Sequence, residues 1–478
     1  MSSEPEGPRI GVDEWVASSE ERRANTLSAR FERAFARVPP IAKLGLLAVP
    51  FVIFPFLVED QYLMQVGVNT LIFVLLALGL NVAVGWVGLL DLGFVAFFGL
   101  GAYLYAALAS DYAGRHLDGV LVIPIIAITV AAAGFLLGLP SRRLVGDYLA
   151  IVTLFFLQLF LVLLINSTFT RGPNGISDIR PLKFFGNEVR SLDGYYAVAL
   201  VTFILVVAVL YLVNQSRTGR AWRALREDEL AAELMTMPVN RLKLMAFAFG
   251  ASIAGVAGAI YAPAQGAIFP ASFDIILLIT VYAMLVLGGA GSLLGATVGA
   301  VIISASLEAL RDPEDASWLV YIAVVLVLLV MIKPWWRGLA VIAGTIAFGL
   351  VVHQAAEQWR PSLVEGTTFG TARIDRLVDD WVLVPVDLVS ADGLPAGATG
   401  RLLYLGLVAA VLGLTLIRNP LWRTIGLVPV LYFAAVVWQN LMLPQPAVAR
   451  FILMGALLVA LMAYRPQGLF GKARVEVV

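Results

Sequence analysis

The polar residues that are able to bind or catalyse gather in one segment of this chain, residues 216–243, which lies between two long apolar runs. The segment carries the cations Arg217, Arg220, Arg223, Arg226, Arg241 and Lys243. Short loops between membrane spans that are rich in Lys and Arg stay on the cytoplasmic side. The chemistry that these residues predict is the binding of a cytoplasmic partner protein. A plain connecting helix with a charged face is the alternative.

The same segment has the spacing of a solvated helix. Two pairs of opposite charge, Arg223 with Glu227 and Arg226 with Glu229, stand three or four positions apart. Opposite charges at these spacings stabilise a helix by a few tenths of a kcal/mol per pair. Pro238 disfavours a helical backbone at Met237, so we expect the helix to stop there.

Composition excludes several other kinds of chemistry. The chain has no Cys, and its two histidines, His116 and His353, have no acidic or metal-ligand pattern around them. No G-x-x-x-x-G-K-[ST] loop is present, because LGGAGSLLG lacks the phosphate-binding Lys. A formal net charge of +0 argues against a nucleic-acid partner. We therefore expect no catalytic residue, no metal site and no cofactor bound by this chain.

The elements that flank the polar segment and position it are expected to be apolar membrane helices. Hydrophobic residues make up 60% of the chain, charged residues only 14%, and the mean hydropathy is +0.89. We predict an all-α, polytopic transmembrane helical bundle with about fourteen candidate spans, at 42–58, 63–84, 86–109, 120–140, 147–166, 194–214, 243–262, 275–289, 292–310, 318–333, 338–353, 401–417, 424–441 and 450–464. Placing the basic loops inside puts both termini in the cytoplasm. The weakest candidate is 86–109, whose Gly-rich start also fits a re-entrant segment.

Two regions lie outside ordinary loops. In residues 1–41, apolar positions recur at helical spacing among arginines, which predicts a basic amphipathic helix on the cytoplasmic lipid surface, with a disordered basic tail as the alternative. The connection 354–400 is long, and an amphipathic helix on the outer surface is expected from Ile374, Leu377, Val378, Trp381 and Val382. Its polar residues, Arg373, Asp375, Arg376, Asp379 and Asp380, are expected to face water.

Several glycine-rich stretches add a specific pattern. They are ALGLNVAVGWVGLLDLGFVAFFGLGAY (77–103), DYLAIVTL with RGPNGIS (147–177), the segment 226–243, LVLGGAGSLLGATVGA (285–300) and YRPQGLFG (464–471). Small residues such as Gly101, Gly250 and Gly258 let membrane helices pack closely. In order and spacing these stretches resemble the permease subunits of branched-chain amino acid ABC importers, of the LivM type.

The resemblance covers about residues 62–333 and resumes near Phe451. It implies an importer permease core at 42–333 with a coupling helix near 219–237. Residues 334–450 then look like an insertion with extra spans and the outer loop 354–400. Residues 451–478 would be the last span and a cytoplasmic tail.

The family implies a machine of several chains in a bacterial or archaeal cytoplasmic (inner) membrane. Its expected partners are a second homologous permease subunit, two cytoplasmic ATPase subunits that use the ATP, an external or periplasmic solute-binding protein and lipid. By this resemblance the ATPase-coupling residues are Arg226, Glu227, Asp228, Glu229, Ala231, Ala232 and Glu233. Thr236 stands where the family usually has Gly after the coupling helix.

Polar residues inside the expected spans are candidates for the solute pathway. They are Asn81, Asp91, Thr153 and Gln158. A charge near mid-membrane costs about 2.5–3.5 kcal/mol, so Asp91 is expected to face protein, water or a partner. A structural hydrogen bond to the Gly-rich turn is the alternative for Asp91, and bridging between helices is the alternative for the other three. Arg171 and Asn174 are expected in an outer turn, with Arg171 placed to touch the binding protein.

Branched-chain or other hydrophobic amino acids are the solute that the resemblance implies. Urea, short amides and carboxylic acids are carried by related importers and remain alternatives. A self-sufficient secondary transporter would need matched interrupted helices in two halves, and no second half is visible. A membrane-embedded enzyme is disfavoured by the isolated histidines.

Overall fold

The computed structural model describes residues 40–110, 117–141, 147–184, 186–332, 334–364, 373–385, 397–417, 419–442, 444–464 and 467–471. They form two compact units, unit 1 (Met1–Asp274) and unit 2 (Ile275–Val478). Of the amphipathic segment expected at 1–41, residues 1–39 lie outside the described residues, as does the tail after residue 471.

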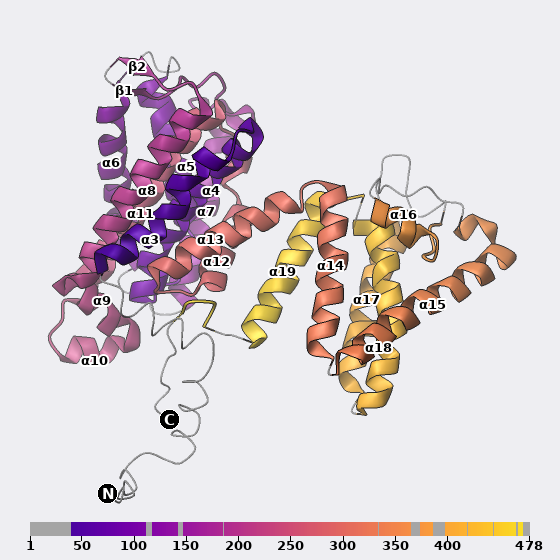
Figure 1. The fold of residues 1–478 in the computed structure, drawn as a ribbon. Helices are drawn as coiled ribbons and strands as arrows, with labels where there is room; N and C mark the ends of the chain where they lie inside the picture. The colour runs from indigo at the N-terminus through magenta and orange to yellow at the C-terminus, as the bar shows by residue number, and fades with distance from the viewer. Residues whose placement is uncertain are drawn as a thin grey trace, which may run out of the picture. The chain divides into compact units, whose positions relative to one another are not determined.

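Unit 1 is a helical bundle with one small hairpin (Figure 1). Its helices are α3 (Pro40–Leu57), α4 (Gln61–Leu80), the π-helix η1 (Asn81–Val87), α5 (Phe94–Ala109), α6 (Gly119–Ser141), α7 (Asp147–Asn166), η3 (Gly172–Asn174), α8 (Leu192–Gln215), α9 (Arg217–Glu227), α10 (Glu229–Leu234), α11 (Val239–Gln265) and η4 (Pro270–Phe273). The hairpin pairs β1 (Lys183–Phe184) with β2 (Asn187–Glu188) in antiparallel register. Helix α11 packs against α4, α5 and α6 and forms the centre of the unit.

Glycines bring the central helices of unit 1 together, as the sequence predicts. A Cβ on Gly101 of α5 would overlap the backbone of Gly255 in α11, and one on Gly258 would overlap the carbonyl oxygen of Phe98. A side chain at either position would therefore push α5 and α11 apart. Close backbone approach of this kind is how small residues stabilise helix pairs in membranes.

Unit 2 contains the remaining helices. They are α12 (Ile275–Gly288), α13 (Leu293–Ala309), α14 (Pro313–Met331), α15 (Trp335–Trp359), η5 (Pro361–Leu363), α16 (Arg373–Asp379), α17 (Gly397–Leu416), α18 (Pro420–Val437), the π-helix η6 (Trp438–Met442) and α19 (Pro446–Tyr464). The stretch after α19 returns to the α12–α13 connection, because Leu469 N donates to Leu287 O at 2.9 Å and Phe470 N to Gly288 O at 2.9 Å. Two of the glycine-rich stretches of the sequence thus meet in space.

The short helix α16 packs onto the other helices of unit 2 by its apolar face. Val378 and Val382 form a buried cluster with Tyr432 of α18. The expectation that all of its polar residues face water is wrong for Asp375, which is 0% exposed. Asp379 also has a protein partner, because Gln439 Nε2 donates to its carboxylate at 3.0 Å.

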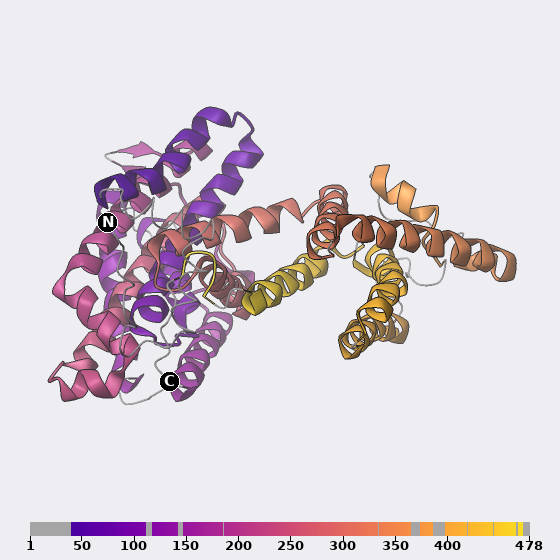
Figure 2. The ribbon, with the colours of Figure 1, turned by 60° about the horizontal axis from the view of Figure 1, so that its bottom comes forward.

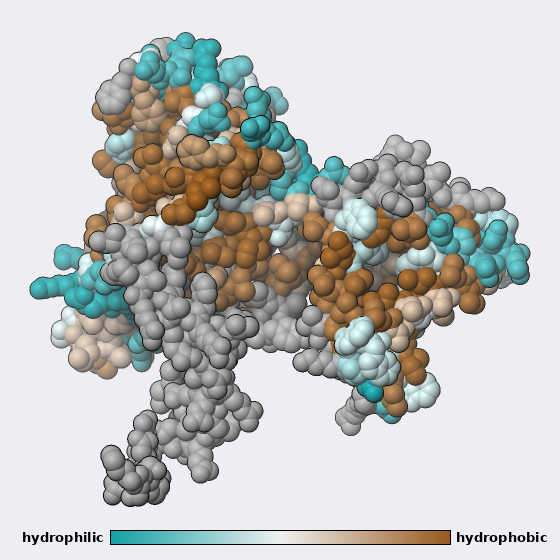
Figure 3. Space-filling view, in the orientation of Figure 1, coloured by the Kyte–Doolittle hydropathy of each residue, from teal (hydrophilic) through white to brown (hydrophobic). Residues whose placement is uncertain are grey.

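The helices have the length and composition of a multi-pass membrane protein. Within the described residues, 8 helices are long and apolar enough to cross a membrane, and further shorter apolar helices include Phe94–Ala109 and Leu293–Ala309. Figure 3 shows an apolar surface over the middle of unit 1, with hydrophilic residues gathered toward two ends. An all-α, polytopic membrane protein is confirmed, whereas the count of about fourteen spans and the side of the termini stay predictions.

One predicted span has different bounds. The expected run 86–109 is broken, because η1 ends at Val87, residues 88–93 are not a regular helix, and α5 begins only at Phe94. Gly88 has a left-handed φ of 81°, a conformation that ends a helix and that glycine adopts without strain. Residues 88–93 are called the breakpoint below.

Candidate functional site: the coupling segment and the breakpoint

The polar segment between α8 and α11 folds as two helices, α9 and α10, at one end of unit 1 (Figure 1, Figure 2). The single helix expected from the sequence is wrong, because Asp228 has an extended backbone with φ −154° and ψ 114°. Its carboxylate accepts a hydrogen bond from Ala231 N at 3.0 Å and so caps the start of α10. We call residues 216–238 the coupling segment.

One ion pair joins the coupling segment to α11. Glu229, which follows the break at Asp228, pairs with Lys243 of α11 at 2.5 Å. The Lys243 side chain is only 3% exposed and that of Glu229 is 34% exposed. Arg223 donates to Asn214 in α8, and Arg226 donates to the carbonyl oxygen of Gly85 in η1 at 2.5 Å. These contacts attach the coupling segment to the membrane helices on three sides.

The segment ends earlier than the sequence predicts. Helix α10 stops at Leu234, three residues before Met237, and Thr236 has a left-handed φ of 62°. A β-branched residue is strained in this conformation, which glycine adopts freely. The backbone at Thr236 therefore favours glycine, which is the residue that the family usually has there.

Trp222 anchors α9, and sequence reasoning missed it. Its indole is buried, and its Nε1 donates to Leu242 O of α11 at 3.0 Å. The ring lies 6.1 Å from that of Trp86 in η1 and 6.5 Å from that of Phe249 in α11, as centroid separations. One signal was available in the sequence, namely a large aromatic residue one turn before Arg226 in an otherwise polar helix.

The face of α10 that points away from the core is apolar. Leu230, Leu234 and Met235 are 72%, 84% and 74% exposed. Of the residues expected to couple to an ATPase, Glu227, Asp228, Ala231 and Glu233 are exposed as well, Glu229 and Arg226 are half-buried, and Ala232 is buried. An exposed apolar face on a helix that is fixed to the core has the character of a protein-binding surface.

The breakpoint gathers two of the four pathway candidates. Asp91 is buried, and its carboxylate accepts a hydrogen bond from Gly93 N at 3.0 Å. Thr153 of α7 accepts one from Leu92 N at 2.9 Å through its hydroxyl oxygen and donates to Ala150 O at 3.0 Å. The predicted alternative of a structural bond from Asp91 to the Gly-rich turn is thus present in the structure.

The other two candidates lie elsewhere. Asn81 is fully buried at the first residue of η1, and Gln158 is exposed on α7, on a different face from Thr153. The structure does not bring Gln158 to the breakpoint. Among the residues that the structure describes there is also no group of three or more His, Asp or Glu side chains that could hold a metal.

The hairpin β1–β2 lies at the end of unit 1 opposite α9 and α10 (Figure 1), and the turn that contains Arg171 and Asn174 lies near the C-terminal end of α11. Asn174 closes the single turn η3, and Arg171 precedes it with a left-handed φ of 58°. Both side chains are exposed. Ile176, just after the turn, pairs with Ile268 in an isolated β-bridge, so this loop is held against the end of α11.

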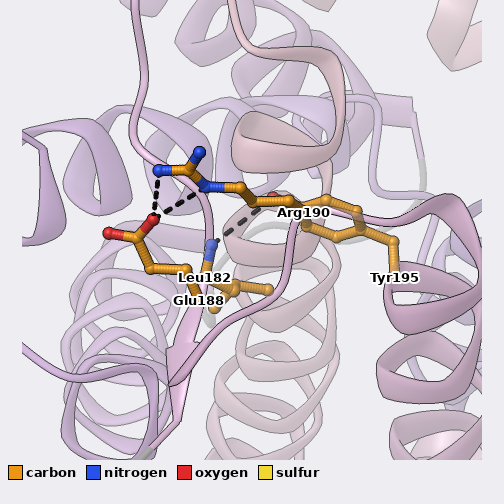
Figure 4. A network of polar contacts seen from close by, with 4 residues as sticks. All are labelled: Leu182, Glu188, Arg190 and Tyr195. Atoms are coloured by element: carbon orange, nitrogen blue, oxygen red, sulfur yellow. Dashed lines mark hydrogen bonds and ion pairs between the residues drawn. The ribbon is translucent and has the colours of Figure 1, made fainter. Parts of the chain in front are cut away.

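A small polar network follows at the hairpin (Figure 4). Arg190 and Glu188 form an ion pair at 2.7 Å, and Leu182 N donates to the Tyr195 hydroxyl oxygen at 3.4 Å. The hydrogen bond and the positive charge from Arg190 hold the pKa of Glu188 below its usual value. The pair lies at the surface, so it contributes little to the stability of the fold.

These features define an all-α, multi-pass membrane protein of the transport permease class, with broken membrane helices and a helical pair anchored between two spans. The chain belongs to the family of branched-chain amino acid transport system permease components, whose family model matches residues 62–332.

Curated relatives agree with this family. The chain is 39% identical over 312 residues to the high-affinity branched-chain amino acid transport system permease protein LivM of Escherichia coli (strain K12), which covers 60% of this chain and 72% of that protein. It is 28% identical over 279 residues to a probable LivM of Methanocaldococcus jannaschii, covering 53% of this chain and 80% of the relative. It is 30% identical over 197 residues to LivH of E. coli, covering 40% and 63%. No solved structure matches the chain.

Proposed function

We propose that this chain is a membrane permease subunit of an ATP-driven importer that moves branched-chain or other hydrophobic amino acids. It acts with a second homologous permease, two cytoplasmic ATPase subunits and an external solute-binding protein. In this proposal it lies in a bacterial or archaeal cytoplasmic membrane with about fourteen spans and with both termini inside. The chain has no nucleotide site of its own, and the energy comes from its partners.

The observation that carries the proposal is the geometry of α10. This helix is capped by Asp228, fixed to α11 through the Glu229–Lys243 ion pair, and covered on its outer face by Leu230, Leu234 and Met235. A helix that must transmit force needs a rigid attachment on one side and a complementary partner on the other. We infer that the exposed apolar face enters a hydrophobic cleft of an ATPase subunit.

The identity of the solute is supported by the relatives alone. The E. coli and M. jannaschii relatives are named as branched-chain amino acid permeases. Urea, short amides and carboxylic acids remain the alternative solutes.

The experiment is co-purification of the tagged chain with its second permease and the ATPase subunits. Apolar anchors at the centre of an interface are each worth about 2 kcal/mol or more. We expect Leu234→Glu to lose the ATPase subunits and keep the second permease. Leu377→Glu is the matched control, because Leu377 is 60% exposed on α16 of unit 2.

Transport is then measured in liposomes that contain the whole complex. Uptake of leucine that needs both ATP and the binding protein is the expected result. Uptake by this chain alone under an ion gradient would instead indicate a secondary transporter. Retention of the ATPase subunits by Leu234→Glu would show that α10 is not the docking helix.

A further inference from the structure

Arg226 was expected, from the sequence, among the residues that face an ATPase, but the structure turns it inward. Gly219, Trp222 and Leu225 form the buried face of α9, and Arg226 continues this face at helical spacing. Arg223, one turn earlier, is exposed. The inward cation belongs to the contact between α9 and the membrane helices.

The partner of Arg226 is the end of a π-helix. Its guanidinium donates to the carbonyl oxygen of Gly85, which lies 141 positions earlier in the chain. Carbonyl groups in the last turn of a helix have no partner within the helix, and a cation there is favoured by both the hydrogen bond and the helix dipole. Arg226 therefore caps η1 from another element. π-Helical turns are rare and occur mostly at functional sites.

The end of η1 leads directly into the breakpoint. Gly88 follows with its left-handed backbone, and a Cβ there would lie 3.2 Å from Cγ of Arg226. The far end of the breakpoint is fixed to α7, since Leu92 N donates to Thr153. Only residues 86–91 separate Gly85, which Arg226 holds, from Leu92, which α7 holds, and this stretch carries the buried Asp91.

We propose that Arg226 is a positioning residue that transmits movement of the coupling segment to the breakpoint. When α9 moves, the hydrogen bond to Gly85 draws the end of η1 with it, while Thr153 holds the other end of the breakpoint. The backbone around Asp91 changes, and with it the start of α5. The inference rests on the proposed function, because it assigns a role within ATP-driven import.

The first test compares Arg226→Met, Arg226→Lys and Arg217→Met in the reconstituted complex. Methionine keeps the aliphatic stem of Arg226 and removes the donor, and lysine keeps a charged donor group. Arg217→Met is the matched control, because Arg217 is exposed on the same helix. The measured quantities are the ATPase subunits retained, the rate of ATP hydrolysis, and the amount of solute imported per ATP.

We expect Arg226→Met to retain the ATPase subunits and hydrolyse ATP, but to import about tenfold less solute per ATP. Loss of a hydrogen bond from a charged group weakens the contact by at least the free energy that corresponds to a factor of ten. Arg226→Lys should recover part of the loss, and Arg217→Met should resemble the unchanged protein. An unchanged import ratio in Arg226→Met, or release of the ATPase subunits, would overturn the proposal. A wild-type complex that does not assemble or import would instead contradict the proposed function.

A second test works even if Arg226→Met folds poorly. A Cβ on Gly88 would lie 3.8 Å from the Cβ of Arg226, a separation that suits a disulfide, and the chain has no Cys of its own. In the double variant Gly88→Cys with Arg226→Cys, the oxidised bond replaces the hydrogen bond as a link. Gly88→Cys alone measures the strain from its left-handed backbone.

The oxidised double variant is expected to import several-fold more solute per ATP than the same protein after reduction. The single Gly88→Cys variant should not respond to reduction. If oxidation and reduction leave the import ratio of the double variant equal, the contact between α9 and the breakpoint does not carry the coupling.

Discussion

The two polar ends of unit 1 are built in opposite ways. The coupling segment is tied into the core, because Trp222 is buried and Arg226 bonds to η1, while Arg217, Arg220 and Arg223 of α9 are exposed. The loop at the other end, residues 167–191, keeps the Glu188–Arg190 pair at the surface, where the Arg190 side chain is 78% exposed. A segment that is tied into the core is able to move the core with it, whereas a surface ion pair adds little to the stability of the fold. The difference supports the coupling role that is proposed for the first end.

The largest effect is expected at the buried anchor of the coupling segment. Trp222→Ala removes the ring contacts to Trp86 and Phe249 and the hydrogen bond to Leu242, and large aromatic truncations in cores cost about 3–5 kcal/mol. We expect the free energy of unfolding to fall by that amount in detergent-solubilised protein. Trp359→Ala is the control, because Trp359 is 81% exposed. If the two variants lost the same free energy of unfolding, Trp222 would not anchor the coupling segment more firmly than an exposed tryptophan does.

A smaller loss of stability is expected at the Glu229–Lys243 pair. Glu229→Gln leaves the ammonium of Lys243 buried without its carboxylate, which costs about 2 kcal/mol, less than in a fully buried pair because Glu229 is 34% exposed. Adding Lys243→Met removes the orphaned charge and should restore part of the stability. Glu233→Gln, on the exposed face of α10, should leave the unfolding midpoint unchanged. A single Glu229→Gln variant as stable as Glu233→Gln would mean that α10 is not held by this pair.

At Thr236 we expect a substitution that stabilises the protein instead of destabilising it. Thr236→Gly relieves a left-handed β-branched residue, and we expect it to raise the free energy of unfolding by about 1 kcal/mol. A change to glycine in the middle of α8, Thr202→Gly, should lower it by a few tenths of a kcal/mol, because glycine is a poorer helix former than threonine. Thermal unfolding of both variants measures the pair of effects. Two losses would show that the exit of α10 is not strained.

The helical membrane fold and the family were predictable because both depend on local pattern. Apolar runs predict helices without knowledge of their neighbours, and the glycine-rich stretches keep their order in the sequence. The division of the coupling segment into α9 and α10 was harder to predict from the sequence. Asp228 caps a helix only once the chain has turned, and the spacing of Glu229 along the helix did not predict its ion pair with Lys243, 14 positions away.

The contacts that form the site could not be predicted from the spacing of residues in the sequence. Arg226 and Gly85 are far apart in the chain, and so are Leu92 and Thr153. Nothing in the local sequence around Arg226 distinguishes it from the exposed Arg223, because both lie on the same polar helix. Their difference arises only when α9 packs against η1 and α11.

The smallest effect on stability is expected at the outer pair. The pKa of Glu188 is lowered chiefly by its hydrogen bond from Arg190, so the carboxylate is charged near neutral pH and the pair is intact. A lowered pKa in the folded state means that the contribution of the ion pair to stability is present above the ordinary pKa of a glutamate and is lost as the pH falls through the lowered value.

Because the pair is fully at the surface, Arg190→Ala should leave the unfolding midpoint almost unchanged near neutral pH and wholly unchanged in acid. Unfolding midpoints of the wild type and Arg190→Ala across this pH range measure the effect, with Arg217→Ala, an exposed cation on α9, as the control. A loss at neutral pH as large as that of Trp222→Ala would mean that the outer network supports the fold as firmly as the coupling segment does.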